Sequence, residues 1–595
     1  MDRPRTIAYF SMEIAVAHEI PTYSGGLGVL AGDTIRSGAD LGLPMVGVTL
    51  LHRGGYFTQS ISADGVQSQE ASAWDPAKQL TELDGRATVQ IEGREVQIRA
   101  WRFDAAGEGG HVVPVLMLDT DLPENSDEDR KLTDRLYGGD DTYRIMQETV
   151  LGVGGVRMLE ATGYTDVNRY HMNEGHAALL VLELVKREAA MLGKKPTDDA
   201  VKAAVREKCI FTTHTPVPAG HDSFTATLAH KVVGSELVSP YLPVPAPAEA
   251  APAKSKKESA SPPLNMTHLG LEYSRYVNGV AKRHGEVSRR MFPGHEIDSI
   301  TNGVHANTWV APAFAGLFDK YLDGWRHDPA EMRNAMAIPL DEIRSAHAKA
   351  KKELIGFVKS STGVAMDENA FTICFARRAT AYKRAHLVLS DPKKLREVAE
   401  KAGPVQILYG GKAHPRDTDG QAIIKQIFET AEELGDAVKV AYVQNYEMTP
   451  CALMVGGCDL WLNTPRPPLE ASGTSGMKAA MNGIPSLSIV DGWWVEGWIE
   501  GVTGWSVGED LYNPDDIPDE GAGEDDPKVV AKRHEKQNAE HADSIYTKLR
   551  ETIVPMFHNE PDRFAEIMRN SIAINGSFFT TQRMMQEYAS RAYLV

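Results

Sequence analysis

The sequence is poor in features that would by themselves point to one class of protein. Four of its 595 residues are cysteine and none forms a C-x-x-C pair, which argues against a disulfide framework or a cysteine-ligated metal site. No run approaches the ~20 apolar residues that cross a bilayer. The first twelve residues, MDRPRTIAYFSM, lack the apolar core of a secretory signal. We therefore expect a cytoplasmic protein with no membrane partner, in which the cysteines are small buried apolar side chains.

Positive charge is also in short supply. Lysine and arginine number 63 against 81 acidic residues, which gives a formal net charge of −18. Nucleic acids require a basic footprint, so we expect none as a partner. Fifteen of the eighteen net charges come from two stretches without Lys or Arg, 119–129 with six acids and 509–526 with nine. We expect both stretches to be solvated loops, which leaves room for a basic pocket elsewhere.

What the chain does have is an ordinary globular composition and a regular alternation of short apolar runs with longer amphipathic stretches. This alternation is typical of α/β proteins and predicts two Rossmann-like halves. The predicted strands are 7–11, 45–51, 112–118 and 209–213 in the first half and 371–376, 405–410, 438–443, 459–463 and 485–490 in the second, and the predicted helices of the first half include 29–41, 141–162 and 175–192.

The same pattern divides the chain into segments. We expect the two halves to span 1–310 and 366–560, with 311–365 as a connecting helical segment and 561–595 as a C-terminal helix that packs across both. Residues 243–263 contain six Pro, six Ala and no aromatic residue. Such a composition cannot offset the entropy of ordering, so we expect a disordered insertion in the first half. A linker between separate domains is the alternative.

A glycine-rich motif, SGGLG at 24–28, precedes the first predicted helix. Glycines at a helix N-terminus let backbone N–H groups approach an anion, and the helix dipole favours negative charge there. A tight turn alone would also explain the motif, whose spacing does not match G-x-G-x-x-G. Anion binding by Gly25 and Gly26 therefore depends on what other residues join them.

A basic motif, RRATAYKR at 377–384, directly follows the predicted strand 371–376. A solvated helix face is the ordinary explanation of such a charge run. Ligands of open α/β sheets, however, bind beyond the carboxyl ends of strands. Arginine offers a planar fork for phosphate and lysine adds a point charge, so the motif is a candidate phosphate site.

A third motif, EASGTSGMKAAMNG at 470–483, is a small-residue loop that runs into a helix and carries one lysine, Lys478. A cation near a helix N-terminus is electrostatically misplaced. A Schiff base would hold the lysine there covalently, whereas a lysine that extends to the surface is the alternative.

Together these motifs resemble the glycogen/α-glucan phosphorylase family, in its short bacterial-type branch. The segment around Lys478 is similar to the family's pyridoxal-phosphate lysine segment, and R-x-x-x-Y-K at 378–383 and SGGLG also match. The resemblance covers most of residues 7–505 in order. Further matching stretches are YHMNEGHAALL (170–180), FTTHTPVPAGHD (211–222), VNGVAKRHGEVS (277–288), ITNGVHANTW (300–309), GGKA (410–413), QNY (444–446) and DGWWVEGW (491–498).

The resemblance implies a GT-B-type fold, in which two Rossmann-like domains face each other across a cleft. It implies reversible, retaining phosphorolysis of an α-1,4-glucan (glycogen, starch or maltodextrin) by inorganic phosphate to give glucose-1-phosphate. It also implies pyridoxal 5′-phosphate on Lys478 as a Schiff base, with the cofactor phosphate as proton relay. The implied roles are catalysis for Arg378, Lys383 and Tyr382; cofactor binding for Lys478, Thr474, Ser475, Gly26, Tyr446 and Arg377; and substrate binding for Gly25, Gly26, Glu470, Ser472, Gly473, His214, His305 and Asn278.

The sequence departs from the family pattern at two positions. Glu447 stands where many members have an arginine on the cofactor phosphate, so that one cationic contact is either missing or supplied by Arg377 or Lys412. Arg275 stands where we expect the family's pocket histidine, four residues before the glycine of VNGVA. No long regulatory extension precedes YFSME (9–13), so we expect constitutive activity.

Two other interpretations stay open, a nucleotide-sugar-dependent GT-B transferase without pyridoxal phosphate and a catalytically inactive glucan-binding protein. A homo-oligomer is compatible with the sequence. The histidines of the first half show no H-x-x-x-H or H-E-x-x-H spacing, so we expect them to contact sugar hydroxyls and expect no metal site.

Overall fold

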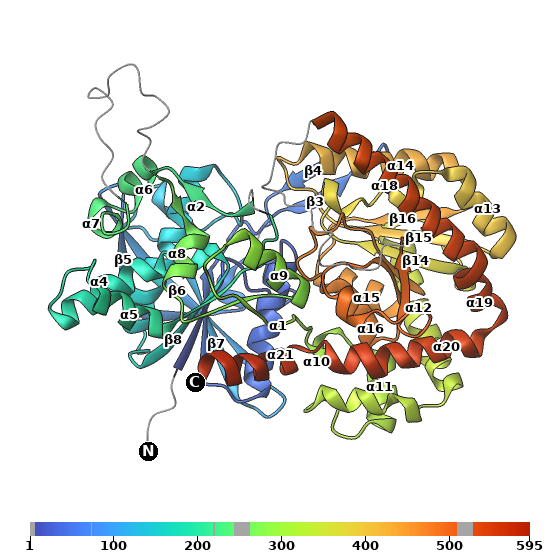
Figure 1. Ribbon diagram of the computed structural model, residues 1–595, viewed down its shortest axis with the longest axis horizontal. Coiled ribbons are helices and arrows are strands. Elements are labelled where there is room, and N and C mark those ends of the chain that lie inside the picture. Colours follow the sequence, from blue (N-terminus) through green and yellow to red (C-terminus); the bar gives the residue numbers. More distant parts are fainter. Residues whose placement is uncertain (1–5, 73, 218–219, 243–261, 509–526) are drawn as a thin grey trace.

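Alternating strands and helices build two separate sheets in the computed structural model, which describes residues 6–72, 74–217, 220–242, 262–508 and 527–595 (Figure 1). Within these ranges the first half forms a nine-stranded sheet, in which seven strands are parallel and the last two, β6 and β5, pair antiparallel. The strand order is β13 (Asp298–Ser299), β12 (Tyr276–Gly279), β9 (Cys209–Thr212), β8 (Val167–Asn173), β1 (Thr6–Phe10), β2 (Met45–Leu50), β7 (Val112–Asp119), β6 (Arg94–Ala106) and β5 (Thr81–Ile91).

The second half forms a six-stranded sheet whose strands are all parallel. Its central strands are buried on both faces by helices, which explains why FTICFA reads as a continuous apolar run rather than an alternating one. The predicted α/β class with two Rossmann-like sheets is confirmed. The strand order is β16 (Lys439–Val443), β15 (Val405–Gly410), β14 (Phe371–Ala376), β17 (Leu460–Asn463), β18 (Ser486–Ile489) and β19 (Gly504–Val507).

The predicted helix 141–162 is interrupted. It consists of α2 (Asp141–Thr149), a π-helical turn over Val150–Gly154 and α3 (Gly155–Ala161). Glycines in this stretch pack closely against their neighbours, because a Cβ on Gly152 would lie 2.5 Å from the backbone nitrogen of Leu180. The wide turn thus places the chain against α4 (Leu180–Leu192).

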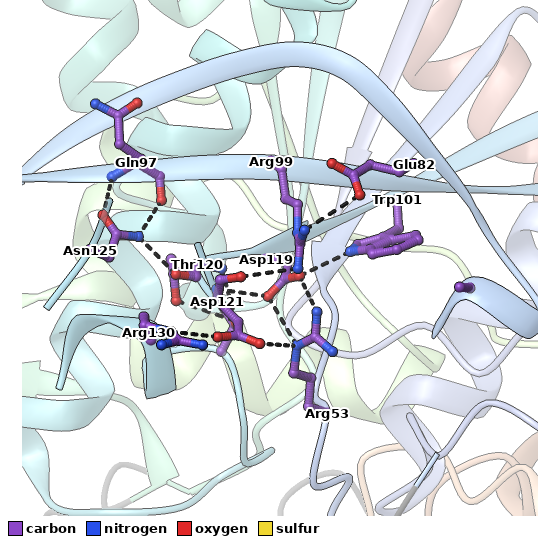
Figure 2. A network of polar contacts seen from close by, with 12 residues as sticks. Arg53, Glu82, Gln97, Arg99, Trp101, Asp119, Thr120, Asp121, Asn125 and Arg130 are labelled. Carbon is purple, nitrogen blue, oxygen red and sulfur yellow. Dashed lines mark hydrogen bonds and ion pairs between the residues drawn. The ribbon is translucent and has the colours of Figure 1, made fainter. Parts of the chain in front are cut away.

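The acidic stretch 119–129 is a solvated loop only in part: residues 123, 124 and 126–128 are exposed in a turn, whereas Asp119 and Asp129 are buried. Asp119 is fully buried and accepts hydrogen bonds from Arg53 Nη2 at 2.6 Å, Arg99 Nε at 2.8 Å and Trp101 Nε1 at 2.9 Å, while Asp121 pairs with Arg130 at 2.7 Å (Figure 2). Burial alone would raise the pKa of Asp119, but Arg53 keeps it below its usual range. Arg53 from the loop after β2, Arg99 from β6 and the nearby Arg130 therefore neutralise Asp119 and Asp121. The other acidic stretch, 509–526, and nearly all of 243–263 lie outside the described residues.

The C-terminal segment returns to the first half of the chain, as predicted. Helix α20 (Pro561–Asn570) packs on α12 (Leu340–Thr362) beside the second sheet, and α21 (Thr581–Tyr588) packs on α1 (Gly26–Asp40) (Figure 1). The hydroxyl groups of Thr581 and Ser37 lie 2.6 Å apart. The last helices thus join both sheets into one body.

A second connection runs in the opposite direction, and the sequence did not predict it. The hairpin of β3 (Thr58–Ile61) and β4 (Gln67–Glu70), here called the clamp hairpin, extends from the first half to the second. Gln67 Nε2 donates to the carbonyl of Ala413 at 2.9 Å, and the amide of Ala413 donates back to Gln67 Oε1 at 3.0 Å. Gln59 and Asn445 exchange a further pair of hydrogen bonds. The two halves are therefore held together on both sides of the cleft.

Candidate active site

A cavity lies between the two sheets, beyond the carboxyl ends of β1 and β14. Its volume is about 460 Å3, and both halves of the chain line it. Ligands of open α/β sheets bind in this position, because the loops after parallel strands meet there. The SGGLG, RRATAYKR and EASGTSGMK motifs, far apart in the sequence, all reach this cavity.

The glycine-rich motif forms the N-terminus of α1. Gly25 is the N-cap residue, no side chain caps the helix, and its first turn carries no acid. A Cβ built on Gly25 or Gly26 would meet no atom within 4 Å. The first-turn amides are therefore accessible from the cavity, and the helix dipole makes this a suitable place for an anion.

Glu13 holds the glycine-rich motif in place through hydrogen bonds to Ser24, and the sequence analysis did not identify it. Its carboxylate accepts hydrogen bonds from the Ser24 amide at 3.1 Å, the Ser24 hydroxyl at 2.9 Å and the Tyr137 hydroxyl at 3.0 Å. Burial raises the pKa of Glu13, and these hydrogen bonds oppose the shift. Gly28 has to be glycine beside it, because a Cβ there would lie 2.5 Å from Glu13 Oε2.

The basic motif supplies one cation that has no partner and two that share one. Lys383 Nζ donates to both carboxylate oxygens of Glu470, at 2.8 and 2.7 Å, and Arg377 Nη2 lies 2.8 Å from Glu470 Oε2. The side chain of Arg378 makes no hydrogen bond or ion pair with any residue that the structure describes. Burial acts to lower the pKa of Arg378, but nearby Tyr382, Tyr56, Tyr137 and Glu13 hold it above its usual value. Arg378 is therefore the cation of this motif that is available to an anionic ligand.

Glu470 and Asp491 form a pair of buried carboxyl groups with opposite pKa shifts. Burial acts to raise the pKa of Glu470, but Arg377 and Lys383 lower it to about 2. Burial raises the pKa of Asp491 to about 7, although it accepts hydrogen bonds from the amides of Glu470 and Gly492, each at 2.9 Å. Glu470 is thus a fixed anion, whereas Asp491 titrates near neutrality.

Lys478 lies at one end of the cavity, on the short helix α16 (Ser475–Met481). Its ammonium nitrogen lies 3.8 Å from the ring centroid of Trp309 and 3.9 Å from Cys451 Sγ. No carboxylate among the described residues pairs with it. An amine that is buried without a salt bridge is available for chemistry. Thr474, Ser475 and Tyr446 line the cavity around it.

Polar side chains of the first half form the opposite wall. His214 Nε2 lies 2.6 Å from Asn173 Oδ1, and the His214 amide donates to Glu174 Oε2 at 2.7 Å. Burial lowers the pKa of His214 to about 3, so its ring is neutral at physiological pH. His176 Nε2 and Asp222 Oδ2 lie 3.3 Å apart on the same wall. Neutral and paired groups of this kind suit sugar hydroxyls.

The structure does not bring every predicted residue to the cavity. The ring of His305 is held by Asp40 at 2.8 Å and Thr308 at 2.7 Å, and Asn278 contacts Thr212 and Tyr588 in the core. Neither residue lines the cavity, so the geometry does not support a substrate-binding role for them. Arg275 also lies elsewhere, with its guanidinium on Glu207 and on the carbonyl of Val595. Of the two histidines predicted to bind substrate, His214 lines the cavity, together with His176 and His414.

The structure brings most of the predicted site residues together in the cavity. The sequence did not identify the additional residues that surround them. The cavity is lined by Gly25, Gly26, His214, Arg377, Arg378, Tyr382, Lys383, Tyr446, Glu470, Ser472, Gly473, Thr474, Ser475 and Lys478. Glu13, Glu174 and Trp309 fall inside stretches that matched the family. A stretch match does not say which of its side chains faces a ligand, and that was the only available signal.

Two α/β sheets that face each other across a cavity, lined by Arg378 and by a glycine-rich helix N-terminus, are the arrangement of a GT-B-type fold. Comparison with known proteins narrows this class. A family model described as carbohydrate phosphorylase matches residues 157–589. The chain therefore belongs to the carbohydrate phosphorylase family.

Individual relatives agree along almost the whole chain. It is 36% identical to a maltodextrin phosphorylase of Thermococcus litoralis over 99% of this chain and 70% of the relative. It is 37% identical to a glycogen phosphorylase of Mycobacterium tuberculosis over 99% of this chain and 71% of the relative, and 31% identical to one of Aquifex aeolicus over 99% and 86%. In the described ranges, no helix is long and apolar enough to cross a membrane, and no three His, Cys, Asp or Glu side chains gather as a metal site.

Proposed function

We propose that this protein is an α-glucan phosphorylase, which cleaves the terminal α-1,4 bond of glycogen, starch or maltodextrin reversibly with inorganic phosphate. Glucose-1-phosphate is released with retention of configuration. One observation carries the proposal: the buried amine of Lys478 and the unpartnered guanidinium of Arg378 line one cavity with the open glycine-rich helix N-terminus. A lysine without a salt bridge, beside a guanidinium group and a helix N-terminus that can both bind an anion, suits a reaction that brings together a covalently held cofactor and phosphate.

The residues around Lys478 fit pyridoxal 5′-phosphate. The amine has an indole face and a thiol as neighbours rather than a carboxylate, and Arg377 Nε and Ser472 Oγ are buried at the cavity wall without a partner in the described chain. Lys478 would hold the cofactor covalently, and Thr474, Gly26, Tyr446 and Arg377 would surround it. When bound, the cofactor supplies a phosphate group with a second pKa near 6, which can exchange a proton near neutral pH.

Arg378 and the amides of Gly25 and Gly26 hold the substrate phosphate in this proposal. Two phosphate groups in one cavity repel each other, and one pair of unit charges at 4 Å costs about 4 kcal/mol at an effective dielectric of 20. Arg378 contributes a full positive charge that no described residue neutralises. The α1 N-terminus adds about half a charge. The cavity is therefore basic within an acidic protein.

Glu470 orients the sugar and keeps Lys383 in place. Its carboxylate is held on two sides by Lys383 and Arg377, so it remains ionised and fixed. Together with Ser472, the backbone of Gly473 and the neutral ring of His214 it offers hydrogen-bond partners to glucosyl hydroxyl groups. Tyr382 packs against Lys383, whose Nζ lies 4.3 Å from the ring centroid.

The decisive test is release of glucose-1-phosphate from maltodextrin and inorganic phosphate by the purified chain. We expect activity, and near-UV absorbance from bound pyridoxal phosphate that Lys478→Ala abolishes. Lys401→Ala, an exposed lysine paired only with Glu397, is the matched control and should keep both. Active protein without the cofactor, or one that needs a nucleotide sugar, would contradict the proposal, as would glucan binding without turnover.

The proposal includes two points of organisation. We place the domain boundaries near residues 310, 366 and 560, where the chain leaves one sheet and enters the connecting and returning helices. The four cysteines are free and buried, which suits a reducing compartment and supports a cytoplasmic location.

A further inference from the structure

A second cavity of about 250 Å3 adjoins the active-site cavity. We call it the lateral pocket. Its lining residues are 17–21, 23, 56–58, 72 and 74 of the first half and 445 and 447–450 of the second half. Tyr23 and Tyr56 line both cavities. The two cavities are therefore separated by these two side chains, and an occupant of the lateral pocket would contact the wall of the active site.

Glu447 lines the lateral pocket and not the active-site cavity. This is the position at which the family resemblance implied an arginine on the cofactor phosphate. Glu447 Oε1 accepts from Lys412 Nζ at 2.9 Å, and the same ammonium donates to the carbonyl of Phe57 at 2.6 Å. The second oxygen, Oε2, has no hydrogen-bond partner among the described residues, and the side chain is 37% exposed. One carboxylate oxygen thus remains available in the pocket while Lys412 compensates the charge.

Asn445 adds a second polar group, in an unusual backbone conformation. Its φ angle is +49°, a left-handed value, and Gln59 holds it there through both its amide and its side-chain oxygen. The Asn445 side-chain nitrogen makes no hydrogen bond within the described chain. A residue that its neighbours hold in a sparsely populated conformation suggests a functional constraint.

The remaining walls of the lateral pocket are aromatic. Tyr56 and Phe57 pack with ring centroids 4.4 Å apart, and Trp74 is positioned by its indole N–H, which donates to the carbonyl of His52 at 3.4 Å. Trp74 is partly exposed rather than in the core. Rigid aromatic faces beside a carboxylate oxygen and an amide make an amphipathic site: the rings cover C–H groups while the polar atoms bind hydroxyls.

We propose that the lateral pocket binds one glucosyl residue of a glucan chain, outside the catalytic cavity. Glu447 and the nearby Glu19 disfavour an anion, and the unpaired polar atoms disfavour a purely apolar ligand. A neutral sugar ring satisfies both kinds of wall. Because its occupant would contact Tyr23 and Tyr56, whose other faces line the active site, the pocket retains long glucans beside the catalytic cavity. The binding site itself does not depend on the proposed chemistry; only the source of the sugar, the substrate glucan, rests on the proposed function.

Maltose binding to the cofactor-loaded full-length chain, followed by ligand-observed NMR, tests the proposal. We expect two maltose sites, one in the active-site cavity and one in the lateral pocket. Trp74→Ala and Glu447→Gln should each remove the site in the lateral pocket. Trp74→Tyr keeps an aromatic face and should retain both sites. Trp498→Ala is the matched control, because Trp498 is a partly exposed tryptophan that donates to Glu500 and lines neither cavity. Thermal unfolding of each variant shows whether it folds.

Kinetics separates this inference from the proposed function. In Trp74→Ala we expect the KM for maltoheptaose to rise at least fivefold, with kcat and the KM for phosphate within twofold of the wild type. Two maltose sites in folded Trp74→Ala and Glu447→Gln would overturn the sugar assignment. So would displacement of maltose from the Trp74-dependent site by tetramethylammonium, because aromatic faces beside a carboxylate can also bind a quaternary ammonium ion. A chain that shows no phosphorolysis but binds maltose through Trp74 would refute the proposed function and leave this inference standing.

Discussion

The ammonium group of Lys383 donates hydrogen bonds to both carboxylate oxygens of Glu470, at 2.8 and 2.7 Å. The lysine of the basic motif, a candidate phosphate ligand from the sequence, and the carboxylate proposed to bind sugar are therefore one buried ion pair. Removing one partner of such a pair leaves a charge uncompensated in a low-dielectric site, and the effect usually exceeds that of the lost contact alone. The two halves of the substrate site are thus coupled through this pair.

The first prediction concerns this coupling. Lys383→Ala should lower kcat/KM by about 100-fold or more, because it removes a cation and frees Glu470 to move toward Arg377. We expect the KM values for phosphate and for glucan to rise together in initial-rate measurements with each substrate varied. A rise confined to phosphate would show that the pair is not a coupling element. Lys393→Ala, an exposed lysine on the first turn of α13 (Pro392–Ala402), serves as the control.

The second prediction concerns the glycine beneath the anion site. A Cβ at position 28 would lie 2.5 Å from Glu13 Oε2, so Gly28→Ala should displace Glu13 and break its hydrogen bonds to Ser24. We expect a loss of activity of about tenfold or more in the phosphorolysis assay. Gly316→Ala, on α11 (Pro312–Tyr321) with no atom within 4 Å of a new Cβ, should keep activity and add about 0.5–1 kcal/mol of stability. Equal activities of the two variants would argue against a role for Glu13.

The third prediction follows from the pKa of Asp491, which burial raises from 3.8 to about 7. Between these two values the folded chain retains a proton that the unfolded chain has lost, so the free energy of unfolding falls as pH rises and levels off above pH 7. Asp491→Asn removes this titration. Relative to the wild type, the variant should therefore gain about 3 kcal/mol between pH 5 and pH 8.

Urea unfolding of both proteins across this pH range provides the measurement. Glu470, whose pKa is about 2, stays ionised throughout and adds no slope. A constant difference between the two proteins from pH 5 to pH 8 would show that Asp491 does not titrate there.

The fourth prediction concerns a buried cluster behind the second sheet. Asp459 is fully buried and is bound by Lys351 Nζ at 2.6 Å and His347 Nε2 at 2.7 Å, both from α12. Asp459→Asn leaves Lys351 without its counter-charge and should cost about 3–5 kcal/mol of stability. Asp436→Asn, at an exposed position, should change stability by less than about 0.5 kcal/mol. A loss below about 1 kcal/mol at position 459 would mean that Lys351 finds another partner.

The sequence predicted the parts of this molecule that depend on local pattern. The apolar runs at 371–376 and 405–410 became β14 and β15 with the same bounds. The motifs around Gly25, Arg378 and Lys478 reached one cavity because each follows a strand or begins a helix at the edge where its own sheet borders the cleft.

What the sequence could not predict depends on contacts between distant segments. Asp119 belongs to an acidic stretch of the sequence but is buried in the structure, because Arg53 and Arg99 from other segments of the chain bind its carboxylate. His305 stands in a matching stretch, yet its ring binds Asp40 rather than facing the cavity. A motif match gives a residue's place along the chain and not the direction of its side chain.

The clamp hairpin and the returning α21 have a consequence for any attempt to divide this protein. Gln59 and Gln67 of the clamp hairpin hydrogen-bond the loops that follow β16 and β15 of the second sheet, and Met584, Met585 and Tyr588 complete the core of the first sheet. A gene split near codon 310 would leave each fragment without a piece of its own interior. Neither half should therefore fold alone, and the two fragments should recover structure only when they are produced together and complement each other.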